Sequence, residues 1–167
     1  MTDPQTTGTD WQSRLQPADI VAFRFPHERS CKRGVPKVRP TLVLDRVEIG
    51  GTPFALLAYG TSSRRPRAPD LLVEVDDVAE IAAASLDAPT RFDGARRILV
   101  SLDNAGFVSC PRRRTPVIGR LTGVSQTRAS FLRAHIRRLV HHRRASLFGR
   151  HRRTSPVATA ACNGDSQ

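Results

Sequence analysis

Arg39 and Thr61 are the residues of this chain whose types and spacing first indicate chemistry. Arg39 stands at the start of one apolar run of strand type, and Thr61 stands at the end of the next. Gly50 and Gly51 lie between the two runs, which predicts a β-hairpin, although not one with a tight two-residue turn. Because the start of one hairpin strand lies beside the end of the other, we expect Arg39 and Thr61 at the same edge of the sheet. A fixed cation beside a hydroxyl is what a phosphate-handling site needs.

The remaining sequence predicts the strands and helices that would hold this hairpin. Strand-type runs, with those of the hairpin included, occur at residues 19–25, 41–47, 53–60, 71–75, 97–102, 107–110 and 116–121. A short helix is predicted at 76–84, and a longer helix from an N-cap at Ser125 to about residue 141. The pattern favours a mostly β (α+β) fold, a small and partly open antiparallel barrel with a C-terminal helix.

Polar ends and basic loops surround this predicted barrel. We expect a disordered lead at residues 1–16, a barrel domain with its helix at 17–144, and a flexible arginine-rich tail at 145–167. The loops at 27–38 and 62–70 and the Arg112–Arg114 turn carry clustered basic residues. No stretch approaches the roughly 20 apolar residues that span a bilayer, and the start of the chain lacks the apolar core of a signal peptide. The cytoplasm is therefore the expected location, with no membrane partner.

Charge is distributed unevenly along the 167 residues. Residues 1–103 hold 14 basic and 14 acidic residues, whereas residues 104–167 hold 13 arginines and one acid, Asp165. The net charge of +12 therefore belongs to the C-terminal part. An excess of this kind attracts polyanions through counterion release, so we expect nucleic-acid affinity. The alternative is an arginine-rich tail that is only solvated.

The cysteines do not indicate a metal or disulfide site. Cys31, Cys110 and Cys162 are far apart in the sequence, and none belongs to a Cys-x-x-Cys pair. The adjacent His141 and His142 would point in different directions on a helix. We therefore expect ordinary reduced thiols, no bound metal and no cofactor.

Several short motifs, in this order and spacing, resemble the PemK/MazF family of toxin endoribonucleases over roughly residues 17 to 140. The motifs are Asp19–Pro26, Arg39–Pro40, Tyr59–Ser62, Thr90–Asp93, Val100–Asn104 and Ile118–Leu121. The resemblance implies an SH3-like barrel that acts as a homodimer and is inhibited by an acidic antitoxin protein. It also implies metal-independent cleavage of single-stranded mRNA, in which the ribose 2′-hydroxyl attacks the adjacent phosphorus.

The resemblance also implies roles for individual residues. Arg39 and Thr61 match the family's catalytic arginine and threonine, and His27 lies in a loop where some members carry a functional histidine. Asp103 matches an acidic residue implicated in some members, although Ser101 stands where those members have an arginine. Residues predicted to contact the RNA are Lys37, Ser62, Arg64, Arg65, Arg67, Arg112, Arg113 and Arg114.

Other readings of the same residues stay open. Arg39 at a strand start is also suited to pairing with a carboxylate, and Asp103 before Asn104 is also suited to a structural turn. The whole chain is also compatible with a non-catalytic barrel that binds nucleic acid or ribosomes through its arginine-rich C-terminal part. A third reading is a gyrase-type protein poison on the same fold.

Overall fold

The computed structural model describes residues 11–26, 36–63, 69–111 and 113–150, with side chains described up to residue 140. Two units are distinguished, residues 1–136 and residues 137–167, and the second contains the C-terminal half of helix α3. The elements are α1 Trp11–Arg14, β1 Asp19–Arg24, β2 Val38–Ile49, β3 Thr52–Thr61, η1 Pro69–Leu71, β4 Leu72–Val75, α2 Val78–Ala83, β5 Thr90–Ser101, β6 Val117–Arg120 and α3 Gly123–Arg150. No helix in the described part of the chain is long and apolar enough to cross a membrane.

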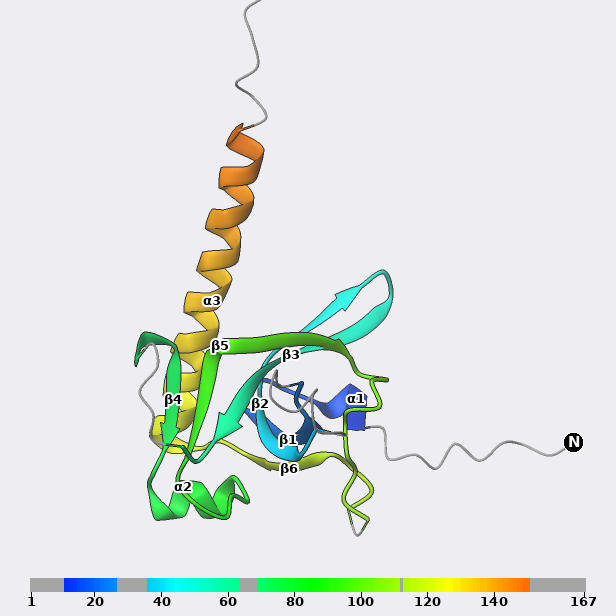
Figure 1. Ribbon diagram of the computed structural model, residues 1–167, viewed down its shortest axis with the longest axis vertical. Coiled ribbons are helices and arrows are strands. Elements are labelled where there is room, and N and C mark those ends of the chain that lie inside the picture. The colour runs from blue at the N-terminus through cyan, green and yellow to red at the C-terminus, as the bar shows by residue number, and fades with distance from the viewer. Residues whose placement is uncertain (1–10, 27–35, 64–68, 112, 151–167) are drawn as a thin grey trace, which may run out of the picture. The chain divides into compact units, whose positions relative to one another are not determined.

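The strands form one curled antiparallel sheet in the order β4-β5-β3-β2-β1-β6 (Figure 1). The sheet makes a half-barrel, and β3 and β2 lie at its centre. This confirms the prediction of a small, mostly β antiparallel fold with a C-terminal helix.

The hairpin of β2 and β3 has a tight two-residue turn, so the prediction of a looser turn was wrong. Ile49 pairs with Thr52, which leaves only Gly50 and Gly51 to reverse the chain. Their φ angles are 59° and 79°, the left-handed values that such a turn requires at both central positions. Glycine accepts these values without steric cost, and both strands therefore extend beyond their predicted ends.

Strand β5 is twice as long as the run predicted at residues 97–102. Its first half was not predicted, because a bulge interrupts the alternation of its residues. Ala58 pairs with Arg97, but the next residue, Tyr59, pairs with Asp93. Residues 94–96 are therefore extra on β5, and the Asp93 carboxylate accepts the N–H of Ala95 at 2.9 Å. The strand predicted at 107–110 does not form; this segment makes only the isolated bridges of Phe107 with Phe23 and Cys110 with Thr115.

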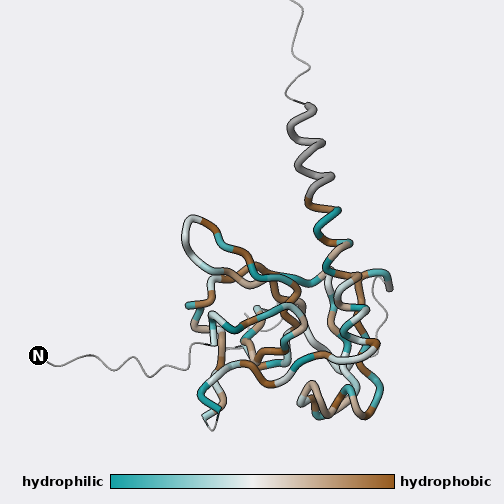
Figure 2. The backbone as a smooth tube through the Cα atoms, turned by 180° about the vertical axis from the view of Figure 1, so that it is seen from behind, coloured by the Kyte–Doolittle hydropathy of each residue, from teal (hydrophilic) through white to brown (hydrophobic). Residues whose placement is uncertain are grey.

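Hydrophobic residues recur along the strands (Figure 2) and form two core clusters, one on each face of the sheet. Neighbouring residues of β1 belong to different clusters, Ile20 to the first and Val21 to the second, as the alternation of side chains along a strand requires. Helix α3 contributes Leu132 to the first cluster. Leu15 is buried in the second cluster, and Trp11 packs on Phe107 with 5.0 Å between ring centroids. Residues 11–16 are therefore part of the folded unit and not of a disordered lead; residues 1–10 lie outside the described residues.

Helix α3 begins at Gly123, two residues before the predicted N-cap, so Ser125 is not its N-cap. Ser125 is buried in the first turn, where its hydroxyl lies 3.0 Å from the carbonyl oxygen of Thr122. The cap comes from α2 instead: the Glu80 carboxylate accepts the N–H of Val124 at 2.6 Å and that of Ser125 at 3.2 Å. A cap from a distant element leaves no local sequence signal. The helix also continues to Arg150, past its predicted end, and residues 151–167 lie outside the described residues.

Candidate functional site

The paired part of β2 and β3 ends two residues before Arg39 and Thr61 would meet. Thr41 pairs with Tyr59, and the same antiparallel register continued by two residues brings Arg39 to Thr61. Gly60 permits the close approach of the two strands here, because a Cβ atom at this position would lie 2.1 Å from the carbonyl oxygen of Pro40. The register thus agrees with the predicted meeting of a cation and a hydroxyl at one end of the hairpin.

A polar row continues from this point across the sheet to its β4 edge. Thr61 pairs with Arg91 of β5, and Arg91 pairs with Glu74 of β4. The Arg91 Nε lies 2.5 Å from Glu74 Oε1, so this arginine already has a carboxylate partner. The Thr61 hydroxyl accepts the N–H of Ser63 at 3.1 Å, which leaves its own proton to donate.

Two arginines lie against the ring of Tyr59, which is buried two residues before Thr61. The Cζ atom of Arg96 is 3.8 Å from the ring centroid and that of Arg39 is 5.6 Å away. Phe25 holds the same ring in an edge-to-face contact at 5.2 Å. Within the described residues, neither Arg39 nor Arg96 forms an ion pair with a carboxylate. This strand end therefore presents two cations that are positioned by an aromatic ring and keep their full charge.

Arg96 was not predicted as a site residue. It lies in the β5 bulge, and only the shifted pairing of Tyr59 with Asp93 brings it to the β3 strand end. The Arg96–Arg97 pair was a visible basic signal, but alternation alone gives no means of choosing between them. The structure separates them: Arg97 donates to the carbonyl oxygen of Gly94 at 2.7 Å, whereas Arg96 stacks on Tyr59.

Asp103 lies at the other end of β3. Ser101 pairs with Phe54, and the N–H of Leu102 donates to the carbonyl oxygen of Pro53. Phe54 and Thr61 are separated by roughly 20 Å of strand, so one chain does not bring Asp103 to the Arg39–Thr61 end. Asp103 is exposed and accepts the side-chain N–H of Gln12 at 3.4 Å. In the adjacent turn, the Asn104 side chain accepts the backbone N–H of Gly106 at 2.8 Å, and the Ser101 hydroxyl accepts that of Asp103 at 3.3 Å.

The other predicted residues fall into three groups. Lys37 and Ser62 are exposed and flank Arg39 and Thr61 in the sequence. Arg113 and Arg114 are exposed in the turn closed by the Cys110–Thr115 bridge, where Arg113 donates to Ile118 O at 2.8 Å. His27, Arg64, Arg65, Arg67 and Arg112 lie outside the described residues.

The chemistry available at this strand end is the binding of phosphate oxygens. Arg39 offers a planar fork of donors, Arg96 adds a second positive charge, and Thr61 adds a hydroxyl. Across the described ranges, no three His, Cys, Asp or Glu side chains gather as a metal site would require. No family model matches this chain, and no curated protein matches it.

Proposed function

We propose that the Arg39–Thr61 strand end is the catalytic centre of a metal-independent endoribonuclease with the SH3-like barrel of the PemK/MazF family. The observation that carries the proposal is the β2–β3 register, which when continued by two residues sets Arg39 opposite Thr61, together with the stacking of Arg96 on the Tyr59 ring. Cations without carboxylate partners next to a hydroxyl suit a reaction that adds negative charge to a phosphate.

In the proposed reaction, the ribose 2′-oxygen bonds to the adjacent phosphorus and the bond from phosphorus to the 5′-oxygen breaks. The 2′-hydroxyl loses a proton, the departing 5′-oxygen gains one, and the products are a cyclic phosphate and a 5′-hydroxyl. Arg39 stabilises the charged phosphorane, because arginine stays protonated in proteins and is a poor base. Thr61 donates to a phosphate oxygen or orients the 2′-hydroxyl. DNA lacks this hydroxyl, so the reaction is selective for RNA.

We further propose that the protein is a cytoplasmic toxin that acts as a homodimer on mRNA and is neutralised by an acidic antitoxin. The net charge of +12 supports an acidic protein partner. His27 and Asp103 remain candidates for the proton transfers: His27 lies outside the described residues, and Asp103 of the same chain is remote from Arg39. Expression should arrest growth, and co-expression of the acidic antitoxin should relieve the arrest.

The test is cleavage of a long single-stranded RNA by the purified protein in EDTA. We expect discrete fragments that end in cyclic phosphate, and their loss in Arg39→Ala. Arg128→Ala is the matched control, because it removes the same charge from an exposed position of α3. Equal cleavage by both variants would rule out the proposed centre.

The second candidate function is a non-catalytic barrel that binds nucleic acid. The observation that favours it is helix α3, which has no acidic residue along its 28 positions. RNA that shifts on a gel in a salt-dependent way, but stays intact with the parent protein, would select this function.

A further inference from the structure

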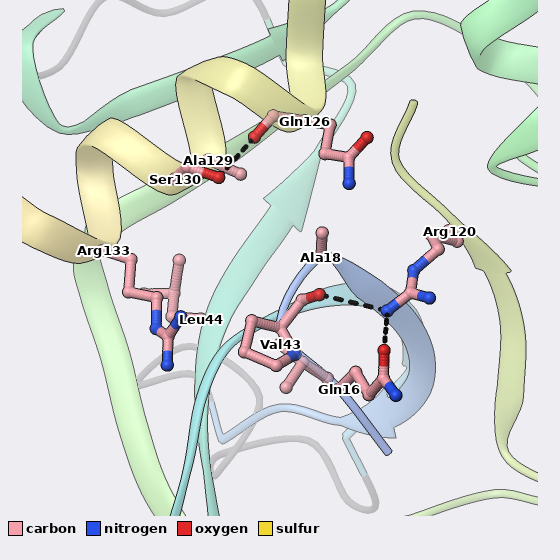
Figure 3. A pocket seen from close by; sticks show the side chains of 10 residues that line it. Gln16, Ala18, Val43, Leu44, Arg120, Gln126, Ala129, Ser130 and Arg133 are labelled. Atoms are coloured by element: carbon pink, nitrogen blue, oxygen red, sulfur yellow. Dashed lines mark hydrogen bonds between the residues drawn. The ribbon is translucent and has the colours of Figure 1, made fainter. Parts of the chain in front are cut away.

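A hollow of about 350 Å³ lies between the start of β1, the middle of β2, β6 and the first turns of α3 (Figure 3). Its floor is apolar and includes Ala18, Val43 and Ala129. Its rim is polar and carries Arg120, Arg133 and Gln126. Along β2, Val43 is four residues from Arg39, or about 13 Å of strand, so the hollow is separate from the candidate catalytic end.

Both rim arginines are fixed in the same way, by an aspartate behind them. The Nε of Arg120 lies 3.3 Å from Asp19, and its Nη2 donates to Gln16 Oε1 at 2.9 Å. Arg133 donates to Asp45 through Nε at 3.2 Å and Nη2 at 2.8 Å. Asp19 and Asp45 are buried, so a ligand in the hollow would not meet them. A guanidinium that is already oriented loses little entropy when it binds a ligand.

Each of these arginines keeps a donor for a ligand. The Nη1 groups of Arg120 and Arg133 have no hydrogen-bond partner within the described ranges. No acidic residue lines the hollow. Burial raises the pKa of Asp19, while the Gln16 N–H and Arg120 lower it in part. Because a carboxylate lies beside each guanidinium, the arginines attract a ligand only weakly at long range. What they offer is hydrogen-bond donors in fixed positions.

The arrangement of these groups indicates the ligand. Figure 3 shows Arg133 and Arg120 on opposite sides of the apolar floor, with the Gln126 amide between them above it. One nucleotide of a single strand has a flat base with donors and acceptors on its edge, and a phosphate on either side. We propose that this hollow binds one nucleotide of a single-stranded nucleic acid, with the base over Ala18 and Val43 and the flanking phosphates on Arg120 and Arg133. The volume lies within the range of small-ligand sites, and the Gln126 amide is placed to read the base edge.

This binding site does not depend on the proposed catalytic function, because a strand would bind there whether or not it is cut. It would give the protein a contact with RNA away from the reacting phosphate. A small molecule with one carboxylate would engage only one of the two arginines, which is why a strand fits the arrangement better.

The test compares two variants of equal charge on the exposed surface of α3. Gln126→Glu places a carboxylate at the rim of the hollow, whereas Thr127→Glu places it one residue further on, away from the lining. Both positions are exposed and leave the Asp19 and Asp45 pairs intact. The probe is a fluorescent 2′-O-methyl single strand of roughly ten nucleotides, which cannot be cleaved by 2′-hydroxyl attack.

We expect Gln126→Glu to weaken binding of the probe about tenfold relative to Thr127→Glu. Equal binding by the two variants, or no binding by the parent at low salt, would overturn the proposal. The same preparations are assayed for RNA cleavage. A difference between the variants in a protein that does not cut RNA would retain this site and reject the ribonuclease, and cleavage without a difference would do the reverse.

Discussion

Two pairs of arginines in this molecule are held in place by opposite means. The guanidinium groups of Arg39 and Arg96 lie over the ring of Tyr59, with Cζ atoms 5.6 and 3.8 Å from its centroid. Arg120 and Arg133 are bonded to the buried carboxylates of Asp19 and Asp45. An aromatic ring orients a cation and leaves its charge, whereas a carboxylate orients it and cancels most of the charge at a distance. The first arrangement suits the stabilisation of developing charge, and the second suits the positioning of a ligand.

The distribution of positive charge in the fold differs from its distribution along the sequence. Along the sequence, the whole excess of +12 lies after residue 103. In the fold, Arg120 and Arg133 from that part are paired with Asp19 and Asp45 from the first part. Residues 1–103, in which basic and acidic residues are equal in number, therefore carry unpaired positive charge at the Tyr59 strand end. Pairing through space, and not position in the chain, decides where the field is strong.

The largest expected effect is the loss of cleavage in Arg39→Lys. Lysine keeps the charge but not the planar fork, and we expect a reduction of about 100-fold or more in the cleavage rate. The measurement is single-turnover cleavage of RNA. In Arg128→Lys, the control on the exposed face of α3, the rate should stay within about twofold of the parent. A similar loss in both variants would mean that the fork at Arg39 has no special role.

Next in size is a loss of stability at the strand end in Gly60→Ala. The new Cβ atom would lie 2.1 Å from Pro40 O, and we expect a loss of about 1–3 kcal/mol in the free energy of unfolding. Cleavage should fall as well, while binding of the uncleavable strand to the hollow should change little. Gly51→Ala is the control: its Cβ meets open space, so only the φ of 79° opposes it, at about 1 kcal/mol. Chemical unfolding measures both; equal losses would show that the β2–β3 contact at Gly60 is not tight.

A smaller effect should follow from uncovering one arginine of the hollow. Asp45→Asn removes the carboxylate beside Arg133, so the plot of log affinity for the uncleavable strand against log salt should steepen by about one unit. Asp70→Asn changes the net charge equally at an exposed position of η1 and should leave the slope unchanged. The same slope in both variants would mean that Asp45 does not screen Arg133.

The smallest effect concerns pH and the cap of α3, the helix that carries Arg133. The hydroxyl of Ser125 and the N–H groups of Val124 and Ser125 lower the pKa of Glu80 from its ordinary 4.5. A lowered pKa in the folded state stabilises the fold above the unfolded value, and this contribution is lost as pH falls through the folded value. The difference in thermal midpoint between the parent and Glu80→Gln should therefore shrink from about pH 7 to about pH 3. Glu48→Gln, which removes the same charge at the exposed end of β2 and away from the α3 cap, is the control, and an equal change in both variants would rule out the cap as the cause.

Sequence reasoning found the parts of the fold that local patterns encode. Alternation on β1 and the hairpin of β2 and β3 follow from periods of two residues and from the two glycines. The first half of β5 was missed because three bulged residues interrupt the period, and the start of α3 was misplaced because its cap comes from Glu80, 43 residues before the helix begins. Both features depend on contacts between distant segments.

The candidate site also contains features that local sequence patterns predict and features that they do not. That Arg39 and Thr61 lie at one end of the sheet could be predicted from the hairpin alone, although a register shift between Val43 and Asp45, which the sequence pattern does not show, sets Arg39 opposite Thr61 and not Ser62. Arg96 and the two arginine–aspartate pairs of the hollow could not, since each depends on how separate strands and α3 come together. Asp103 shows the converse: a motif match in the sequence lies at the far end of β3 in the fold.

The short helix α2 affects whether copies of this protein can associate through an edge of the sheet. The outer strands of the sheet, β4 and β6, are four residues each, and Ala84, at the end of α2, lies against Gly119 in the middle of β6. Exposed strand edges are templates on which further chains can add and aggregate. At the β6 edge, which is short and overlaid by a helix end, an added strand would find few free amides to pair with. A larger side chain at Gly119 would push this cover away, and its first visible sign should be aggregation during refolding.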